Sequence, residues 1–170
     1  MLAPRPAWAP YIAEALGTFA LVFVGPGAAA VNVRSGGGVS NVGVGMSFGL
    51  IVMAMIFAVG HISGCHINPA VTIAFRAIGR MTTKRALGYI LAQLIGAAIA
   101  GFAIIAIVGH QGDAGATTPH INGASAAFWS ELILTFFLVF VIFAVATDER
   151  AQGAFAAIAI GGYVGLAATG

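Results

Sequence analysis

Five stretches of this chain are apolar and long enough to cross a lipid bilayer, which takes about 20 such residues. They cover approximately residues 11–33, 40–60, 85–109 and 127–147, and a fifth starts near 154 and is still apolar at Gly170. Only 7% of the 170 residues are charged, against about a quarter in a soluble domain. Such a chain cannot cover its surface with polar groups, so we expect an all-α membrane protein.

The segment 61–80, between the second and third stretches, is apolar enough to enter the membrane and too short to cross it. From residue 60 the sequence reads GHISGCHINPAVTIAF. Asn68 is a favourable N-cap and Pro69 suits the first helical position, so a short helix is expected over 69–77. Irregular backbone at membrane depth is tolerated only where it is buried in protein or lines water. Residues 61–67 are therefore predicted to border a cavity.

The predicted half-helix gives this cavity a definite chemistry. Its N-terminus lies near the membrane midplane and carries roughly half a unit of positive charge, which disfavours cations, including hydronium. The Asn68 amide offers a donor. A row of backbone carbonyl acceptors precedes it, at Gly64, Cys65, His66 and Ile67. One donor beside a row of acceptors suits a file of small neutral molecules that form hydrogen bonds.

The distribution of Lys and Arg predicts the orientation, because cytoplasmic loops carry an excess of both. With a cytoplasmic N-terminus, six of the seven basic residues fall inside: Arg5, Arg76, Arg80, Lys84, Arg85 and Arg150. Only Arg34 falls outside. We therefore expect a multi-pass protein of the plasma membrane whose N-terminus is cytoplasmic.

An internal repeat links the two halves of the chain. Residues 14–24 (EALGTFALVFV) recur with seven identities of eleven at 131–141 (ELILTFFLVFV), an offset of 117. Shared Leu, Val and Phe are common in apolar helices, but an intramembrane Glu four residues before a Thr is not. If each unit holds three spans, the second enters from the opposite side, as in the inverted repeats of transport proteins.

The repeat also predicts the domain organisation. A first repeat is expected over 1–110, with three spans and the half-helix, and an incomplete second repeat over 111–170, with two spans. Asn68 plus the offset of 117 places a second Asn-Pro-Ala near residue 185, beyond the last residue given.

The sequences GHISGCHINPAVT and AEALGTF together resemble the aquaporin family of major intrinsic proteins, and the resemblance covers the whole chain. The stretch GLIVMAMIFAVGHISGCHINPAVTIAF is most similar to bacterial members and to the plant nodulin-like branch, which pass water, glycerol or uncharged metalloids. The resemblance implies a six-span homotetrameric channel in which two Asn-Pro-Ala half-helices meet at the midplane. Of this aquaporin-like inverted repeat, we expect five transmembrane helices and one re-entrant half-helix, without the second Asn-Pro-Ala region and the sixth span.

The resemblance also implies roles for individual residues. Asn68, Pro69 and Ala70 match the pore signature, and the four carbonyls before them match the family's acceptor ladder. Phe48, twenty residues before Asn68, matches one wall of the selectivity constriction and resembles water-selective members. Ala168 aligns with a second wall, where a small residue would widen the filter. These two positions favour different solutes.

Two intramembrane carboxylates have two alternative interpretations. Glu14 and Glu131 match buried family residues that accept hydrogen bonds from the re-entrant loops and brace them. An ion-coupling role is the alternative, because intramembrane carboxylates are often functional. His61 and His66 lack a third ligand, so no metal site is expected, and His66 is expected to line the inner vestibule.

The leading function is a passive channel for water, with small neutral solutes such as glycerol as further candidates. It implies no catalysis and no cofactor, and the chain has no basic run that could follow a nucleic acid. A gradient-driven secondary transporter and a non-conducting truncated channel fragment are the alternatives.

Overall fold

The computed structural model describes residues 5–116, 123–147 and 154–169. Within these ranges all regular secondary structure is helical. The elements are α1 (Ala9–Arg34), α2 (Ser40–Ser63), α3 (Pro69–Ala77), α4 (Thr83–Val108), the 3-10 turn η1 (Gln111–Gly115), α5 (Gly123–Thr147) and α6 (Ala154–Ala167). Four of the described helices, α1, α2, α4 and α5, are long and apolar enough to cross a membrane. The predicted all-α membrane fold is confirmed.

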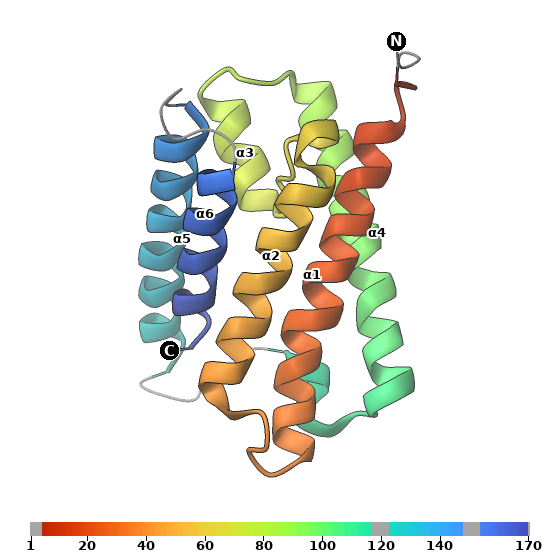
Figure 1. Ribbon diagram of the computed structural model, residues 1–170, viewed down its shortest axis with the longest axis vertical. Coiled ribbons are helices and arrows are strands. Elements are labelled where there is room, and N and C mark those ends of the chain that lie inside the picture. The colour runs from red at the N-terminus through yellow and green to blue at the C-terminus, as the bar shows by residue number, and fades with distance from the viewer. Residues whose placement is uncertain (1–4, 117–122, 148–153, 170) are drawn as a thin grey trace.

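The long helices stand side by side in one bundle (Figure 1). Helix α1 packs between α2 and α4, and α2 packs on its other side against α6, which in turn contacts α5. The short α3 lies at the end of the bundle where α1 begins, and it contacts α4 and α5. The chain leaves α2 at this end, turns back into the bundle, and returns along α3, so the re-entrant path is visible in the ribbon.

Two predicted boundaries differ from the structure. Helix α2 continues to Ser63 rather than residue 60, and it ends where Gly64 adopts a left-handed φ of 90° and donates its N–H to the Gly60 carbonyl. Glycine is the usual residue at such a C-terminus because it carries no Cβ. The irregular segment is therefore 64–68 rather than 61–67. Helix α6 has 14 residues, fewer than a span needs.

Glycines allow two of the helix contacts to be close. A Cβ atom added at Gly96 of α4 would collide with the backbone of Ala15 in α1. In the same way, Gly49 of α2 lies against the backbone of Gly161 in α6. Small residues at helix crossings are typical of membrane proteins, because the hydrophobic effect does not drive helix association in lipid and close van der Waals packing does. These contacts hold α4 close to α1 and α6 close to α2.

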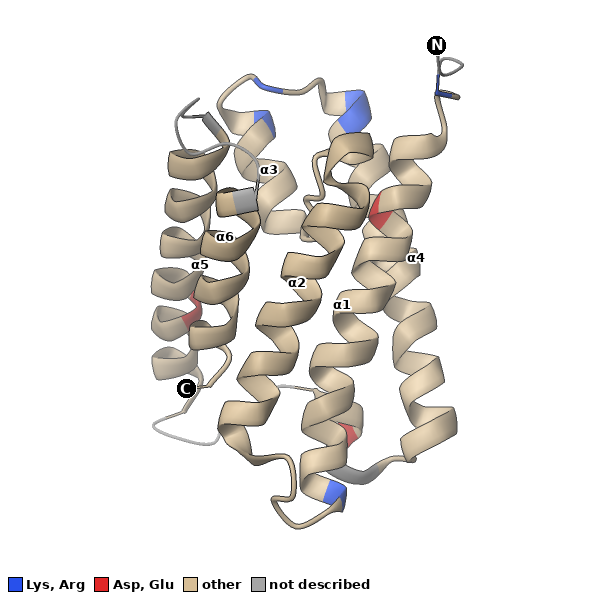
Figure 2. Ribbon diagram, viewed as in Figure 1, with Lys and Arg blue, Asp and Glu red and all other residues tan. Residues whose placement is uncertain are grey.

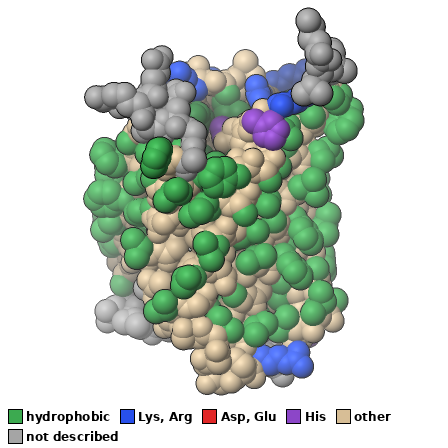
Figure 3. Space-filling model, in the orientation of Figure 1, with side chains coloured by type: hydrophobic (Ala, Val, Ile, Leu, Met, Phe, Trp, Pro, Cys, Tyr) green, Lys and Arg blue, Asp and Glu red, His purple; other side chains and the backbone are tan. Residues whose placement is uncertain are grey.

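The surface separates by polarity. Large apolar side chains are exposed along the sides of the helices, among them Phe57, Phe102 and Phe136. Hydrophobic side chains are spread over the face seen in Figure 3. Described Lys and Arg residues gather at the end where α1 begins, whereas Arg34 lies at the opposite end (Figure 2). Arg150, which the predicted orientation also uses, lies outside the described residues.

Candidate functional site

The re-entrant segment 64–68 has an unusual backbone. Cys65 and Ile67 are not glycines, yet they adopt left-handed φ values of 50° and 42°, next to Gly64 at 90°. Each such residue costs about 1–3 kcal/mol and persists only where its surroundings hold it in place. Asn68 then returns to an extended conformation, with φ −153° and ψ 126°. The segment therefore depends on interactions with the rest of the bundle.

Glu14 of α1 supplies most of these interactions from a fully buried position. Its Oε1 accepts hydrogen bonds from the Ser63 hydroxyl at 2.6 Å and the His66 N–H at 2.9 Å. Its Oε2 accepts from the Ile67 N–H at 2.7 Å and the Gln93 amide at 2.8 Å. Four donors surround two oxygens that act only as acceptors, as an ionised carboxylate does. Such charge-assisted bonds are stronger than neutral ones, so this side chain stabilises the left-handed turns.

The backbone N–H groups and the backbone carbonyls of the segment differ in their hydrogen bonding. Every N–H from residue 64 to residue 67 is bonded within the protein: Gly64 to the Gly60 carbonyl, Cys65 to the Ser63 hydroxyl, and His66 and Ile67 to Glu14. None of the four carbonyls of residues 64–67 accepts a hydrogen bond from a described residue. Backbone carbonyls at membrane depth require a partner. These four acceptors are therefore available to water or to a solute.

Asn68 ends the segment and begins α3. Its Oδ1 accepts the Ala70 N–H at 2.8 Å and its carbonyl accepts the Thr72 N–H at 3.1 Å, while Pro69 occupies the first helical turn. The predicted helix 69–77 and its cap are confirmed. The Asn68 Nδ2 group has no partner among the described residues, so it remains a donor next to the four acceptors.

Sequence reasoning missed the polar side chains that support this segment from α3 and α4. Gln93 is 1% exposed, and its Nε2 donates both to Glu14 and, at 2.9 Å, to the Thr72 hydroxyl. The Thr72 Oγ1 atom lies 3.2 Å from His66 Nδ1. A buried chain of hydrogen bonds thus joins Glu14 to His66. The signal available in the sequence was a lone glutamine within an apolar span, which is costly there unless it is paired.

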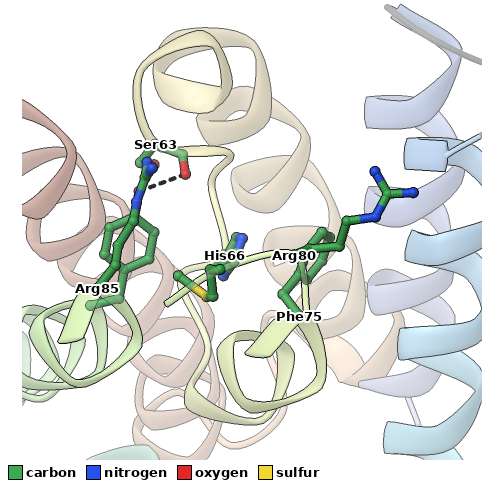
Figure 4. Close-up of a pocket in the computed structure, with 7 residues that line it drawn as sticks. Ser63, His66, Phe75, Arg80 and Arg85 are labelled. Atoms are coloured by element: carbon green, nitrogen blue, oxygen red, sulfur yellow. Dashed lines mark hydrogen bonds between the residues drawn. The ribbon is translucent and has the colours of Figure 1, made fainter. Parts of the chain in front are cut away.

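A cavity of about 270 Å³ lies beside His66 at the end of the bundle where α1 begins. Figure 4 shows His66 between Arg85 on one side and Arg80 on the other. The lining residues are Ser63, His66, Phe75, Arg80, Met81, Arg85 and Tyr89. The His66 ring lies 4.5 Å from that of Phe75 and 5.4 Å from that of Tyr89, centroid to centroid. His66 therefore lines a cavity, and the assignment of this cavity as the inner vestibule stays a prediction.

The remaining predicted residues lie elsewhere in the bundle. Phe48 is half-buried on α2 with its ring against Gly25 of α1, and Ala168 is half-buried just after α6. Because α2 and α6 adjoin, both residues are compatible with one constriction, which stays a prediction. Cys65 is 8% exposed and packs with Val52 in the core rather than lining the cavity.

Glu131 differs from its repeat counterpart. It lies exposed on α5 and has no hydrogen bond to any described residue, whereas Glu14 is buried with four donors. Its bracing role stays a prediction. His61 is exposed in the last turn of α2, and no group of three metal-ligating side chains occurs within the described ranges.

The fold and the site together define a polytopic helical membrane protein with a re-entrant half-helix, a construction typical of transport proteins. The family model described as "Major intrinsic protein" matches residues 2–169. The chain therefore belongs to the major intrinsic protein family.

Two plant relatives and one solved structure illustrate the similarity. The chain is 45% identical to "Aquaporin NIP1-3" of Oryza sativa subsp. japonica over 90% of its own length and 54% of that protein's length. It is 42% identical to "Aquaporin NIP3-1" of Arabidopsis thaliana, over 91% and 50% respectively. Its fold is similar to that of the aquaglyceroporin from Plasmodium falciparum, with a TM-score of 0.77 and 29% identity over 95% of this chain and 69% of that one. The chain spans about half the length of these two plant relatives.

Proposed function

We propose that this protein is a passive membrane channel for water, with small neutral solutes such as glycerol as further substrates. One observation carries the proposal: every N–H of residues 64–67 is bonded inside the protein, while the four carbonyls face no described donor. Together with the Asn68 amide donor, which has no partner among the described residues, they form a pathway on which a neutral molecule can exchange one hydrogen bond for the next.

The same segment accounts for the exclusion of cations. Helix α3 begins at Pro69 inside the bundle, so its N-terminus presents a partial positive charge to the pathway. A cation would be repelled by this charge and would also lose part of its hydration shell, at a large cost in free energy. A neutral molecule is not repelled, and the free energy of hydration that it loses is small. Asn68, Pro69 and Ala70 are accordingly proposed as the pore signature.

The proposed solutes follow from the family and from two positions. Phe48 favours water and Ala168 a wider filter, so the two together fit water with some passage of glycerol. The name of the Plasmodium falciparum aquaglyceroporin supports glycerol as a candidate. We further propose a homotetramer in the plasma membrane with a cytoplasmic N-terminus. The gathering of Lys and Arg at one end of the bundle supports this orientation.

A gradient-driven transporter is less well supported. It would need a titrating or ion-binding group coupled to the solute site. Glu14 is the buried candidate, but its two oxygens already accept four hydrogen bonds from the protein. Neither oxygen has an acceptor position left for an ion, so bracing the re-entrant segment is the proposed role.

Glycerol uptake into proteoliposomes tests the proposal. Vesicles containing the chain are mixed with isotonic glycerol, and their swelling is followed with and without an ionophore that removes ion and proton gradients. A channel predicts swelling faster than that of empty vesicles and unchanged by the ionophore. Swelling that stops when the gradients are removed would support the transporter instead.

A further inference from the structure

We propose that the cavity beside His66 binds a small oxoanion, such as phosphate or a phosphate monoester group, through Arg85 and Arg80. A bound anion would occupy the entrance to the carbonyl row and slow the flow of solute. The binding step stands apart from the proposed function, and only its effect on flow rests on that function.

Arg85 is held in a fixed orientation at the wall of the cavity. Its Nε and one terminal nitrogen donate to the Tyr89 hydroxyl at 3.2 Å and 2.7 Å, and its guanidinium carbon lies 5.2 Å from the centre of the Tyr89 ring. Tyr89 is fully buried and donates in turn to the Ser63 carbonyl at 2.8 Å. A guanidinium has five N–H donors, so three remain after these two bonds. Two parallel N–H groups of a pre-organised guanidinium can donate to two oxygens of one phosphate group.

Arg80 provides the second positive charge from the other side of the cavity. Its side chain is exposed, extends away from Arg85 in Figure 4, and makes no hydrogen bond to the described residues. Its long side chain can therefore swing toward a bound anion. Arg85 is the fixed element of the site and Arg80 the movable one.

Among the described residues, no carboxylate opposes these charges at the cavity wall. None of its lining residues is acidic, and the stretch 76–85 holds four basic residues and no acidic one. Glu14 lies behind the wall with both oxygens occupied by donors. Concave sites with charge of a single sign concentrate counter-ions, so the cavity favours anions.

The shape of the cavity fits the same ligand. Phe75 and Met81 give it apolar walls beside the two guanidinium groups, and a low local dielectric strengthens charge-assisted bonds. Its volume of about 270 Å³ accommodates an oxoanion together with water, since one water takes up about 30 Å³. His66 and Ser63 belong both to this wall and to the edge of the re-entrant segment. An anion here would lie across the approach to the carbonyl row.

Calorimetric titration with inorganic phosphate tests the binding directly. The chain is placed in nanodiscs of neutral phosphatidylcholine at low ionic strength, and three variants are compared with it. Arg85→Gln removes the fixed fork and should weaken binding by about tenfold or more, because charge-assisted bonds are lost. Tyr89→Phe keeps the ring but releases the guanidinium, and should weaken binding by a smaller factor.

Lys84→Gln is the matched control. Lys84 is an exposed neighbour of the same charge that does not line the cavity, so its affinity for phosphate should stay within about twofold of the parent, a change of well under 1 kcal/mol. Equal weakening by Lys84→Gln and Arg85→Gln would overturn the site in favour of diffuse surface charge. The absence of phosphate binding to the folded chain in neutral discs would overturn it as well.

A second set of discs identifies the source of the anion. If lipid headgroups supply the phosphate, discs containing phosphatidylglycerol should lower the apparent affinity for free phosphate, and Arg85→Gln should abolish the difference. An affinity for free phosphate that phosphatidylglycerol does not change would assign the site to free anions. Either result supports an oxoanion site at Arg85. In flux assays, phosphate that binds without slowing glycerol entry into conducting vesicles would contradict the occlusion. A chain that binds phosphate and conducts nothing would count against the proposed function alone.

Discussion

At the scale of single residues, Glu14 organises the site. Its four hydrogen bonds reach α2, the re-entrant segment and α4, and they hold two non-glycine residues in left-handed conformations. The stabilisation comes from pairing a buried charge completely. A partial loss of that pairing leaves buried donors unsatisfied, which is costly inside a membrane.

Replacement of Glu14 by glutamine should lower the free energy of unfolding by about 3 kcal/mol or more. An NH2 group then replaces one carboxylate oxygen, so a donor faces the donors that this oxygen accepted from. Thermal unfolding in detergent, followed by circular dichroism, measures the effect. Glu131→Gln is the matched control: this carboxylate is exposed on α5 without a described partner, so its replacement should shift the unfolding temperature little. Equal shifts in the two variants would contradict the bracing role of Glu14.

The residues of the site divide into those that the sequence predicts and those that it does not. The roles of Asn68 and Pro69 can be predicted from the sequence, because a helix cap and a first helical turn have local sequence signals. The importance of Glu14 can be predicted because the internal repeat singles it out. Gln93 contacts Glu14 across 79 positions of the chain, and Tyr89 reaches Ser63 across 26. Such pairings depend on how α4 packs, which no local pattern encodes.

At the scale of elements, the half-helix α3 and the close helix crossings determine the geometry of the proposed pathway. The predicted bounds of α3 were correct, whereas the end of α2 was placed three residues too early. A left-handed glycine sets that end, and Gly64 looks no different in sequence from the many other glycines of this chain. The fold class follows from hydropathy alone, but the positions of closest helix approach do not.

Glycine-to-alanine changes on α4 distinguish packing from helix propensity. Gly96→Ala should lower stability by about 1–3 kcal/mol, because its Cβ would meet the α1 backbone at Ala15. Gly101→Ala on the same helix meets nothing within 4 Å and should be neutral or stabilising by up to about 1 kcal/mol. Thermal unfolding of both variants decides the matter. A Gly96→Ala chain as stable as Gly101→Ala would show that α1 and α4 are not packed this closely.

Two helix caps separate stability from conduction. Asn68→Ala and Thr82→Ala each remove an N-cap, of α3 and α4 respectively, and each should cost about 1 kcal/mol. Only Asn68→Ala also removes the amide donor beside the carbonyl row, so only this variant should lower solute flow beyond its effect on the amount of folded protein. Swelling rates normalised to inserted protein measure it, and equal rates for both variants would argue against Asn68 as a pore residue.

At the scale of the whole molecule, the bundle encloses an irregular polar segment within an apolar exterior. Hydropathy predicted four of the five proposed spans closely, and the fifth is the 14-residue α6. The match to the family model over residues 2–169 identifies the chain as a major intrinsic protein. The basic end of the bundle, with its cavity beside His66, is the predicted entrance from the cytoplasm.

Osmotic water flow tests the central claim, that the carbonyls of residues 64–67, which accept no hydrogen bond from a described residue, border a continuous path for neutral molecules. Proteoliposomes containing the folded, inserted chain are exposed to a sudden increase in external osmolarity, and light scattering reports their shrinkage. The proposal predicts shrinkage faster than that of empty vesicles, independent of ion gradients and reduced by Asn68→Ala. Shrinkage at the rate of empty vesicles, with the chain folded and inserted, would contradict it.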